Sequence, residues 1–376
     1  MPQNIASQDL YKALVNSGVN FFSGVPDSIT GEFSKFLQVS HPDEHLAAAN
    51  EGNAIGVAIG SYLATSKVPT VYMQNSGLGN AVDPLVSLVD PAVFGIPLVL
   101  LVGWRGQPNI HDEPQHQKQG EITPDLLSIM GIPHTVLSRN QQEMSQQVEL
   151  AVHTAIRDQR PYALVIEKGY FTPEDDGMVS GVYALSREAA ISVIAKELDQ
   201  SDAIIAGIGK TSRELFEYRE KSGQSHSNDL LVVGGMGHAS SIALGVAKQL
   251  PDQRVYCIDG DGSVLMHMGA LAAIGSQNPT NFCHIVINNG VHDSVGGYPH
   301  AGSNANVRKL AEASGYTQTI IATDEAELMS AIAISKKNNG PTLIEVIVNA
   351  GARGDLGRPT MSPRENMESF KKFLEN

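Results

Sequence analysis

The chain has little cysteine and few charged residues, and both scarcities narrow what the protein can be. Its 376 residues include two cysteines, Cys257 and Cys283, which are too few for a disulfide framework. Each lies in an apolar, β-branched run typical of a buried strand, so we expect two reduced thiols in the core. Charged residues make up 18% of the chain, below a usual value of about 25%. This low fraction predicts extensive buried surface, including a subunit interface.

Basic charge and long apolar runs are also scarce. Lys and Arg number 26 against 40 Asp and Glu, for a formal net charge of -14. This balance argues against nucleic-acid partners, which need a basic surface. The N-terminus shows no basic segment followed by an apolar one, as a signal peptide would. The longest apolar stretch, residues 91–104, is broken by Pro and Gly and is shorter than the roughly 20 residues a membrane helix needs. We therefore expect a cytoplasmic protein with no membrane partner.

The length and the strand pattern predict two domains. At roughly 150 residues per domain, two domains fit this chain better than one or four. Apolar runs separated by helical segments are typical of a parallel sheet covered on both faces. They occur at residues 20–25, 69–75, 97–104, 134–138 and 162–169, and again at 202–209, 230–235, 254–260, 282–289 and 342–348. The predicted fold class is α/β, with two doubly wound parallel-sheet domains. Residues 172–183, rich in acidic residues, Gly and Pro, are the predicted linker between domains 1–171 and 184–376.

Oxygen-bearing side chains follow two predicted strands of the second half. The strand at residues 254–258 runs into Asp259-Gly260-Asp261-Gly262-Ser263. A later strand ends in Asn288-Asn289-Gly290, with Asn288 27 residues after Asp261. In a parallel sheet both positions lie at the carboxyl edge, where ligands bind. Carboxylate, amide and carbonyl oxygens are the hard donors that Mg²⁺ prefers, with diphosphate oxygens completing the set.

A glycine cluster precedes this pair. Gly234 to His238 follow a predicted strand and open a helix of small residues. Glycines at such a turn let the backbone approach a phosphate, and the helix N-terminus supplies amide donors. A second candidate, Gly207 to Thr211, ends like a phosphate-binding P-loop, but the first glycine of that motif would fall at Ile204. A dinucleotide-binding glycine motif is also missing after the first strand of either half.

Together these residues resemble the GDG…NN signature of thiamine diphosphate enzymes. The resemblance implies that Asp261 and Asn288 bind Mg²⁺ with the carbonyl of Gly290. It also implies that Met236 supplies the apolar side chain under the cofactor. The full set of residues expected to contact the cofactor in this half is Gly235, Met236, Gly237, His238, Gly260, Gly262 and Ser263.

Glu51 matches the carboxyl group that activates the cofactor in this family. That group bonds the pyrimidine ring and must lie in a poorly solvated place. Around Glu51, Ala47, Ala48 and Ile55 offer no counter-charge, and an exposed Glu at a helix edge fits these apolar neighbours less well. The resemblance makes residues 1–171 the pyrimidine-binding domain and 184–376 the diphosphate-binding domain, without a third, central domain. It also implies a homodimer or larger homo-oligomer with active sites at the subunit interface.

Across nearly the whole chain, segments such as SGVPDS, HDEPQH, GKTSRELFE and GDGSVLMHMGAL resemble the phosphonopyruvate decarboxylase family. This implies non-oxidative decarboxylation of 3-phosphonopyruvate to phosphonoacetaldehyde and CO₂, dependent on thiamine diphosphate and Mg²⁺, in phosphonate biosynthesis. Sulfopyruvate decarboxylation, a related thiamine diphosphate carboligase, and a non-enzymatic nucleotide-binding protein remain alternatives.

Related decarboxylases move protons with an Asp after the first strand and with a His-containing loop. Asp27, His111 and His116 match them. Asp27 could instead cap the following helix, and both histidines could lie on a solvated loop. The anionic tail of the substrate needs cationic or amide donors, for which Arg is well suited. The candidates for binding the substrate are Asn75, Ser76, Arg105, Lys118, His292, Arg353 and Arg358.

Overall fold

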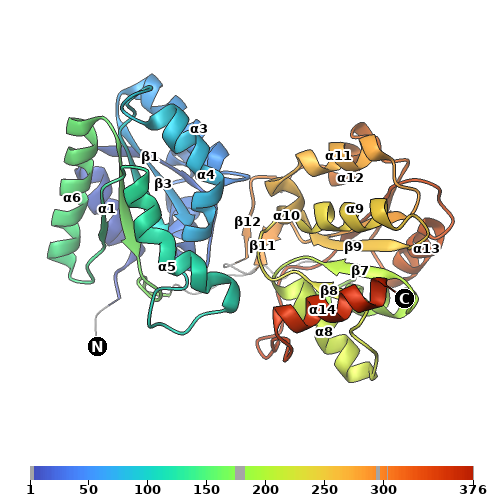
Figure 1. Ribbon diagram of the computed structural model, residues 1–376. Coiled ribbons are helices and arrows are strands. Elements are labelled where there is room, and N and C mark those ends of the chain that lie inside the picture. Colours follow the sequence, from blue (N-terminus) through green and yellow to red (C-terminus); the bar gives the residue numbers. More distant parts are fainter. Residues whose placement is uncertain (1–3, 174–182, 294–296, 303, 376) are drawn as a thin grey trace. The chain divides into compact units, whose positions relative to one another are not determined.

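The computed structural model describes residues 4–173, 183–293, 297–302 and 304–375. The described residues form two compact units, one of residues 4–173 with 297–301 and the other of residues 183–293 with 302 and 304–375 (Figure 1). Residues 174–182 of the predicted linker lie outside the described residues.

A six-stranded sheet organises the first unit. Its strands are β1 (Val19–Gly24), β2 (His45–Ala47), β3 (Val68–Gln74), β4 (Leu98–Gly103), β5 (His134–Val136) and β6 (Pro161–Ile166). They lie in the order β2-β1-β3-β4-β6-β5, and every pair is parallel. The connecting helices are α1 (Ser7–Asn16), α2 (Gly31–Ser40), α3 (Glu51–Thr65), α4 (Leu78–Pro84), α5 (Pro114–Ile129) and α6 (Gln141–Asp158), with short helical turns η1 (Pro42–Glu44), η2 (Asn75–Gly77) and η3 (Leu85–Val89).

Helices cover both faces of this sheet. One buried cluster joins the sheet to α1, α2 and α6 through residues such as Leu10, Phe33 and Val148. The cluster on the opposite face contains Ile55 of α3 and Leu78 of α4. Because side chains alternate between the faces of a strand, a strand covered on both sides must be apolar at nearly every position. This requirement explains the unbroken apolar runs in the sequence.

The second unit contains another six-stranded parallel sheet. Its strands are β7 (Ala203–Ala206), β8 (Asp229–Leu231), β9 (Val255–Gly260), β10 (Phe282–Asn288), β13 (Gln318–Ala322) and β14 (Thr342–Ile347), in the order β13-β14-β10-β9-β7-β8. Two short strands, β11 (Val291–His292) and β12 (Tyr298–Pro299), lie outside it. The helices are α7 (Arg187–Glu197), α8 (Lys210–Ser222), α9 (Ala239–Gln249), α10 (Asp261–Met266), α11 (Gly269–Gln277), α12 (Val307–Ala313), α13 (Glu325–Ser335) and α14 (Pro363–Leu374).

The two faces of this sheet hold one cysteine each. The core on the side of α7, α8 and α13 contains Cys283. The core on the side of α9, α11, α12 and α14 contains Cys257. Both thiols are buried and free, which confirms the expectation of two reduced core cysteines.

The two sheets share one topology. Counted from the first strand of each unit, both orders read 2-1-3-4-6-5, so each strand of one sheet has an equivalent in the other. The predicted fold class is confirmed. Two edge strands, β2 and β13, were not predicted: β2 is only three residues long, and β13 begins with the polar residues Gln318 and Thr319 and is mostly half-buried. No described helix is long and apolar enough to cross a membrane.

Candidate active site

Two oxygen donors meet at the carboxyl edge of the second sheet. Strands β9 and β10 are paired so that Gly260 lies opposite Ile287, which brings Asp261 and Asn288 to the same level. The Gly290 amide donates to Asp261 Oδ2 at 2.8 Å and to Asn288 Oδ1 at 3.0 Å. The structure therefore places a carboxylate oxygen and an amide oxygen around one backbone N–H. This is the donor chemistry that Mg²⁺ prefers, so the residues present fit the ion.

Glu345 orients the Asn288 amide. Asn288 Nδ2 donates to Glu345 Oε1 at 2.7 Å, and Glu345 is buried in the neighbouring strand β14. Because the NH₂ group is held by Glu345, the oxygen of the same amide faces Asp261. Sequence reasoning missed Glu345. The signal was available, since it is the one charged residue in the apolar run of residues 342–348.

The glycine cluster lies against the segment that carries Asp261. Gly235 and Gly237 have φ values of 68° and 85°, which glycine adopts without strain. A Cβ on Gly237 would lie 2.9 Å from the Ser263 carbonyl oxygen and 2.6 Å from a ring carbon of His267. Only glycine allows this approach. The two predicted cofactor-binding motifs therefore come together at the same edge.

Other predicted cofactor residues surround this contact. The His238 ring lies 4.4 Å, centroid to centroid, from the His267 ring, and His238 directly precedes α9. Met236 is half-buried, and Ser263 is buried. The amides of Gly260 and Gly262 are bonded to the side chains of the aspartates that precede them, at 3.0 and 2.9 Å. The cluster thus offers a glycine-rich loop at the start of an eleven-residue helix, which suits a phosphate group.

A buried ion network anchors the chain just beyond Gly290. Arg187 binds Glu214 through two hydrogen bonds of 2.8 and 2.9 Å and also pairs with Asp293. The Gly351 amide donates to Asp293 Oδ1 at 2.8 Å, and Lys210 Nζ donates to the Asp293 carbonyl at 3.0 Å. Lys210, the lysine of the P-loop-like stretch, therefore stabilises the chain at Asp293 through a hydrogen bond to its backbone. The side chain of His292 lies outside the described residues.

In the first unit, Glu51 follows the edge strand β2 and begins helix α3. Its side chain is buried, with 6% exposed, and Oε2 accepts from Asn80 Nδ2 at 2.8 Å. A Cβ on Gly77 would overlap the other carboxylate oxygen, so glycine is required there. The carboxyl group is therefore enclosed and has a neutral amide as its partner. Sequence reasoning missed both Gly77 and Asn80, which lie after β3 in η2 and α4.

Asp27 follows strand β1 and is buried. Its Oδ1 accepts from the amides of Ile29 at 2.6 Å and Thr30 at 3.2 Å, and its Oδ2 accepts from the Thr30 hydroxyl. Asp27 thus organises the turn before α2, the structural role considered in the sequence analysis. Burial raises the pKa of the Asp27 carboxyl, although these hydrogen bonds and the charge of Arg105 act to lower it. A carboxyl group in this state can hold a proton.

Arg105 follows strand β4 and joins two loops. It donates to Asp112 Oδ2 at 2.7 Å through Nε and to Ser28 Oγ at 2.7 Å through Nη1. Burial acts to raise the pKa of Asp112, but the hydrogen bonds from Arg105 and from two backbone amides hold it well below its usual range. His111, exposed, lies next to Asp112, and half-buried His116 lies in the first turns of α5. Arg105 therefore fastens the predicted His loop to the loop of Asp27.

Two further substrate candidates are already bonded within the chain. Asn75 is 1% exposed, and its amide bonds the Arg105 backbone at 2.8 and 3.1 Å and the Thr123 hydroxyl at 2.9 Å. Arg353 is surrounded by the carboxylates of Glu188, Glu217 and Asp355. Both side chains thus have structural roles here, and their binding of substrate stays a prediction.

The remaining candidates are more open. Ser76 is exposed and accepts from Gln74 Nε2 at 2.7 Å. Lys118 is exposed and pairs with Glu121 at 3.0 Å. Both are accessible to a ligand, and their roles stay predictions.

Comparison with known proteins supports this chemistry. Residues 5–129 match the family described as "Thiamine pyrophosphate enzyme, N-terminal TPP binding domain", and residues 207–346 match the corresponding C-terminal TPP binding domain. The chain is 32% identical to a phosphonopyruvate decarboxylase of Streptomyces viridochromogenes, over 98% of this chain and 95% of that enzyme. Identity to the phosphonopyruvate decarboxylase of Streptomyces hygroscopicus is also 32%, over 98% and 94%. A sulfopyruvate decarboxylase of Methanosarcina acetivorans is 28% identical over 90% of each chain.

Both halves of a thiamine diphosphate enzyme are therefore present in one chain, and the similarity extends over almost its full length. The chain is a thiamine diphosphate-dependent decarboxylase and belongs to the phosphonopyruvate decarboxylase family.

Proposed function

We propose that the protein decarboxylates 3-phosphonopyruvate to phosphonoacetaldehyde and CO₂, with thiamine diphosphate and Mg²⁺, in phosphonate biosynthesis. The similarity over 98% of the chain to two phosphonopyruvate decarboxylases carries this proposal. The donor set at Asp261 and Asn288 supports the metal requirement, because their two oxygens converge on one amide.

Asp261, Asn288 and the carbonyl of Gly290 would hold Mg²⁺ together with diphosphate oxygens. The loop from Gly235 to His238 and the start of α9 would receive the diphosphate. When bound, the cofactor supplies the electron sink for the electron pair that is released as CO₂ departs.

The chain's own residues hold the cofactor and move protons. Glu51 would bond the pyrimidine ring from its buried position, where Asn80 fixes the carboxyl group and Gly77 leaves room for it. Asp27, whose pKa is raised by burial, would supply a proton to the product carbon. Arg105 would keep the His111 and His116 loop close to Asp27 through Asp112 and Ser28. The Nε and Nη2 donors of Arg105 are engaged by Asp112, so its binding of the anionic tail stays a prediction.

The test of the substrate is CO₂ release from phosphonopyruvate, sulfopyruvate and pyruvate, measured side by side with thiamine diphosphate and Mg²⁺. We expect kcat/KM for phosphonopyruvate to exceed the others by at least about tenfold. A preference for sulfopyruvate would favour the second candidate function, which the similarity to the Methanosarcina acetivorans enzyme supports. Turnover of none of the three would contradict both, and a carbon–carbon bonded product on addition of an aldehyde would identify a carboligase.

A homodimer with shared active sites is part of the proposal. Gly56 and Gly60 lie on one exposed face of α3, and a Cβ at either would meet nothing within 4 Å in the described residues of the chain. Such a face lets a second helix approach closely.

Mixing two inactive variants tests the shared site. If Glu51 of one subunit acts with Asp261 of another, a randomly reassembled equal mixture of Glu51→Gln and Asp261→Ala chains recovers about a quarter of wild-type activity. If each chain carries a complete site, the mixture stays as inactive as its components.

A further inference from the structure

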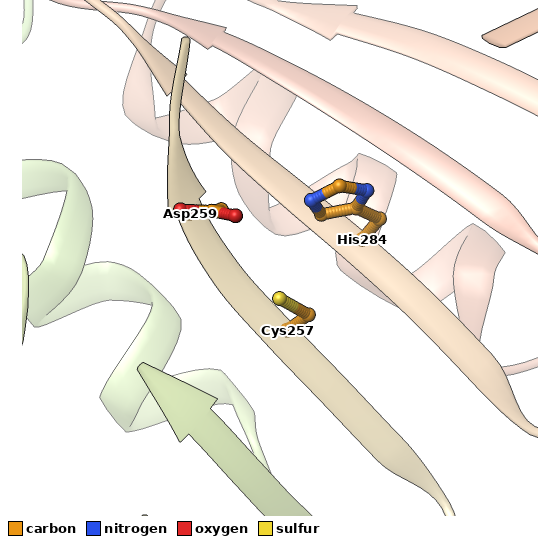
Figure 2. A group of neighbouring side chains, drawn as sticks. All are labelled: Cys257, Asp259 and His284. Atoms are coloured by element: carbon orange, nitrogen blue, oxygen red, sulfur yellow. The ribbon is translucent and has the colours of Figure 1, made fainter. Parts of the chain in front are cut away.

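Three donor side chains of different chemistry converge inside the second unit. Cys257 and Asp259 lie two residues apart on β9 and so point to the same face of the sheet. His284 on β10 is the register partner of Cys257. One potential ligand atom from each residue lies within 4.8 Å of those of the other two. Figure 2 shows the thiol, the carboxylate and one ring nitrogen directed toward a common space between the two strands.

Two of the potential ligand atoms have no hydrogen-bond partner within the part of the chain that the structure describes. They are Asp259 Oδ2 and His284 Nε2. Both residues are buried, with 1% and 0% exposed. A buried polar atom without a partner destabilises the folded state. Two such atoms that face one another and a thiol indicate that a bound group completes the cluster.

The other polar atoms of these side chains are held in place. His284 Nδ1 lies 3.2 Å from the Tyr316 hydroxyl. The Gly260 amide donates to Asp259 Oδ1 at 3.0 Å, and the Ser263 side chain also hydrogen-bonds the Asp259 carboxyl. When Nδ1 donates its proton to Tyr316, Nε2 keeps a lone pair directed at the cluster. Metal-binding histidines and carboxylates are usually oriented by such partners.

We propose that Cys257, Asp259 and His284 bind a divalent transition metal of the Zn²⁺ class. A thiolate, an imidazole and a carboxylate are ligands that Zn²⁺ accepts together. Mg²⁺ prefers oxygen donors, so this site differs in chemistry from the oxygen pair at Asp261 and Asn288. A thiolate and a carboxylate carry two negative charges, which a divalent ion neutralises. The complex is therefore neutral, as burial requires.

The ion would join β9 to β10 just below the ends that carry Asp261 and Asn288. Because all three donors are buried, the metal would enter as the unit folds and exchange slowly afterwards. Its role is structural, and it does not depend on which 2-oxo acid the enzyme takes.

Elemental analysis of the full-length protein tests the site. The chain is purified without a metal-affinity step, dialysed against a chelator and then against Mg²⁺, and analysed by mass spectrometry for zinc, iron and cobalt. We expect about one transition-metal ion per chain in the wild type and under about a tenth of that in Cys257→Ala. Cys283→Ala is the matched control, because its thiol lies on the opposite face of the sheet and should leave the metal content unchanged.

Cobalt provides a measurement that needs no variant. Protein expressed in cobalt-supplemented medium should show a thiolate-to-cobalt charge-transfer band in the near ultraviolet, which the Cys283→Ala variant retains. Wild-type protein without stoichiometric metal, or cobalt-loaded protein without this band, would overturn the proposal. Equal metal content in the two cysteine variants would overturn it as well.

Discussion

The two sheets have the same strand order, yet their carboxyl edges carry different chemistry. After the second strand, the first unit places the buried carboxyl group of Glu51, and the second places the glycine loop that ends at His238. After its fourth strand, the first unit places Arg105, bonded to Asp112, whereas the fourth strand of the second unit ends at Asn288, whose oxygen shares the Gly290 amide with Asp261. One topology thus fixes where functional residues lie, and the residue types decide what each edge binds.

The surroundings of these groups differ as well. In the first unit, Asp27 and Glu51 are enclosed and bonded to neutral donors or backbone amides, and burial raises the pKa of the Asp27 carboxyl. In the second, Asp261 and Asn288 converge on a backbone amide beside a glycine loop, which suits a cation and a phosphate. The comparison predicts that damage to the first edge impairs catalysis, whereas damage to the second impairs cofactor binding.

Glu51→Gln should produce the largest effect. We expect kcat to fall by about 10² to 10⁴, because the carboxyl group that would activate the cofactor is lost. The affinity for thiamine diphosphate and Mg²⁺ should change little, since the second edge is intact. Steady-state kinetics with calorimetric titration of the cofactor separates the two quantities. Glu149→Gln, an exposed position on α6, is the control. A large loss of cofactor affinity with unchanged kcat would show that the first edge serves cofactor binding rather than catalysis.

Glu345→Leu should weaken Mg²⁺ binding at the second edge and leave catalysis nearly unchanged, the reverse of the result expected for Glu51→Gln. Without Glu345, the Asn288 amide can rotate, so we expect Mg²⁺ affinity to fall by about 10- to 100-fold. The kcat at saturating Mg²⁺ should be nearly unchanged. Glu345→Gln keeps an acceptor for Asn288 Nδ2 and should restore most of the affinity. Equal behaviour of the two variants in a Mg²⁺ titration would show that Glu345 does not orient Asn288.

Gly77→Ala tests the enclosure of Glu51. The added methyl group would overlap the carboxylate, so we expect a stability loss of about 1–3 kcal/mol and a lower kcat. Gly79→Ala is the matched control, because a Cβ there meets nothing within 4 Å. Thermal denaturation and kcat are measured for both variants. A fully active Gly77→Ala enzyme would argue that Glu51 does not need its present position.

The smallest expected effect is a loss of folding stability in the first unit at acidic pH, caused by His45. Burial lowers the pKa of His45 to about 4, and His45 Nε2 lies 2.7 Å from the Tyr72 hydroxyl. The unfolded chain, with a histidine pKa of about 6.5, takes up this proton first as pH falls, so stability is lost between pH 6.5 and 4. From pH 7 to pH 5 the loss attributable to His45 is about 2 kcal/mol.

His45→Gln should therefore unfold with a weaker pH dependence than the wild type. Exposed His153→Gln should follow the wild type. Denaturant titration at pH 7 and pH 5 measures the difference, and identical slopes for all three proteins would show that His45 is not buried as a neutral group.

The central strands and part of the candidate site could be predicted from the sequence alone. The apolar runs predicted the central strands, because a strand covered on both faces must be apolar throughout. The spacing of Asp261 and Asn288 predicted that they meet, because consecutive strand ends share one edge. Strand β2 is three residues long, and both β2 and β13 are mostly half-buried or exposed, so neither left such a run.

The sequence by itself determined the two parallel-sheet units, the residue types at each carboxyl edge and the membership of a thiamine diphosphate enzyme family. The tertiary structure alone decided which of those residues are already bonded. Glu345 reaches Asn288 across 57 residues of sequence, Asn80 reaches Glu51 across 29, and Arg105 is held by Asp112 and Ser28. Such pairs leave no local signal, because the hydrogen bonds that orient a site form between segments that only folding brings together.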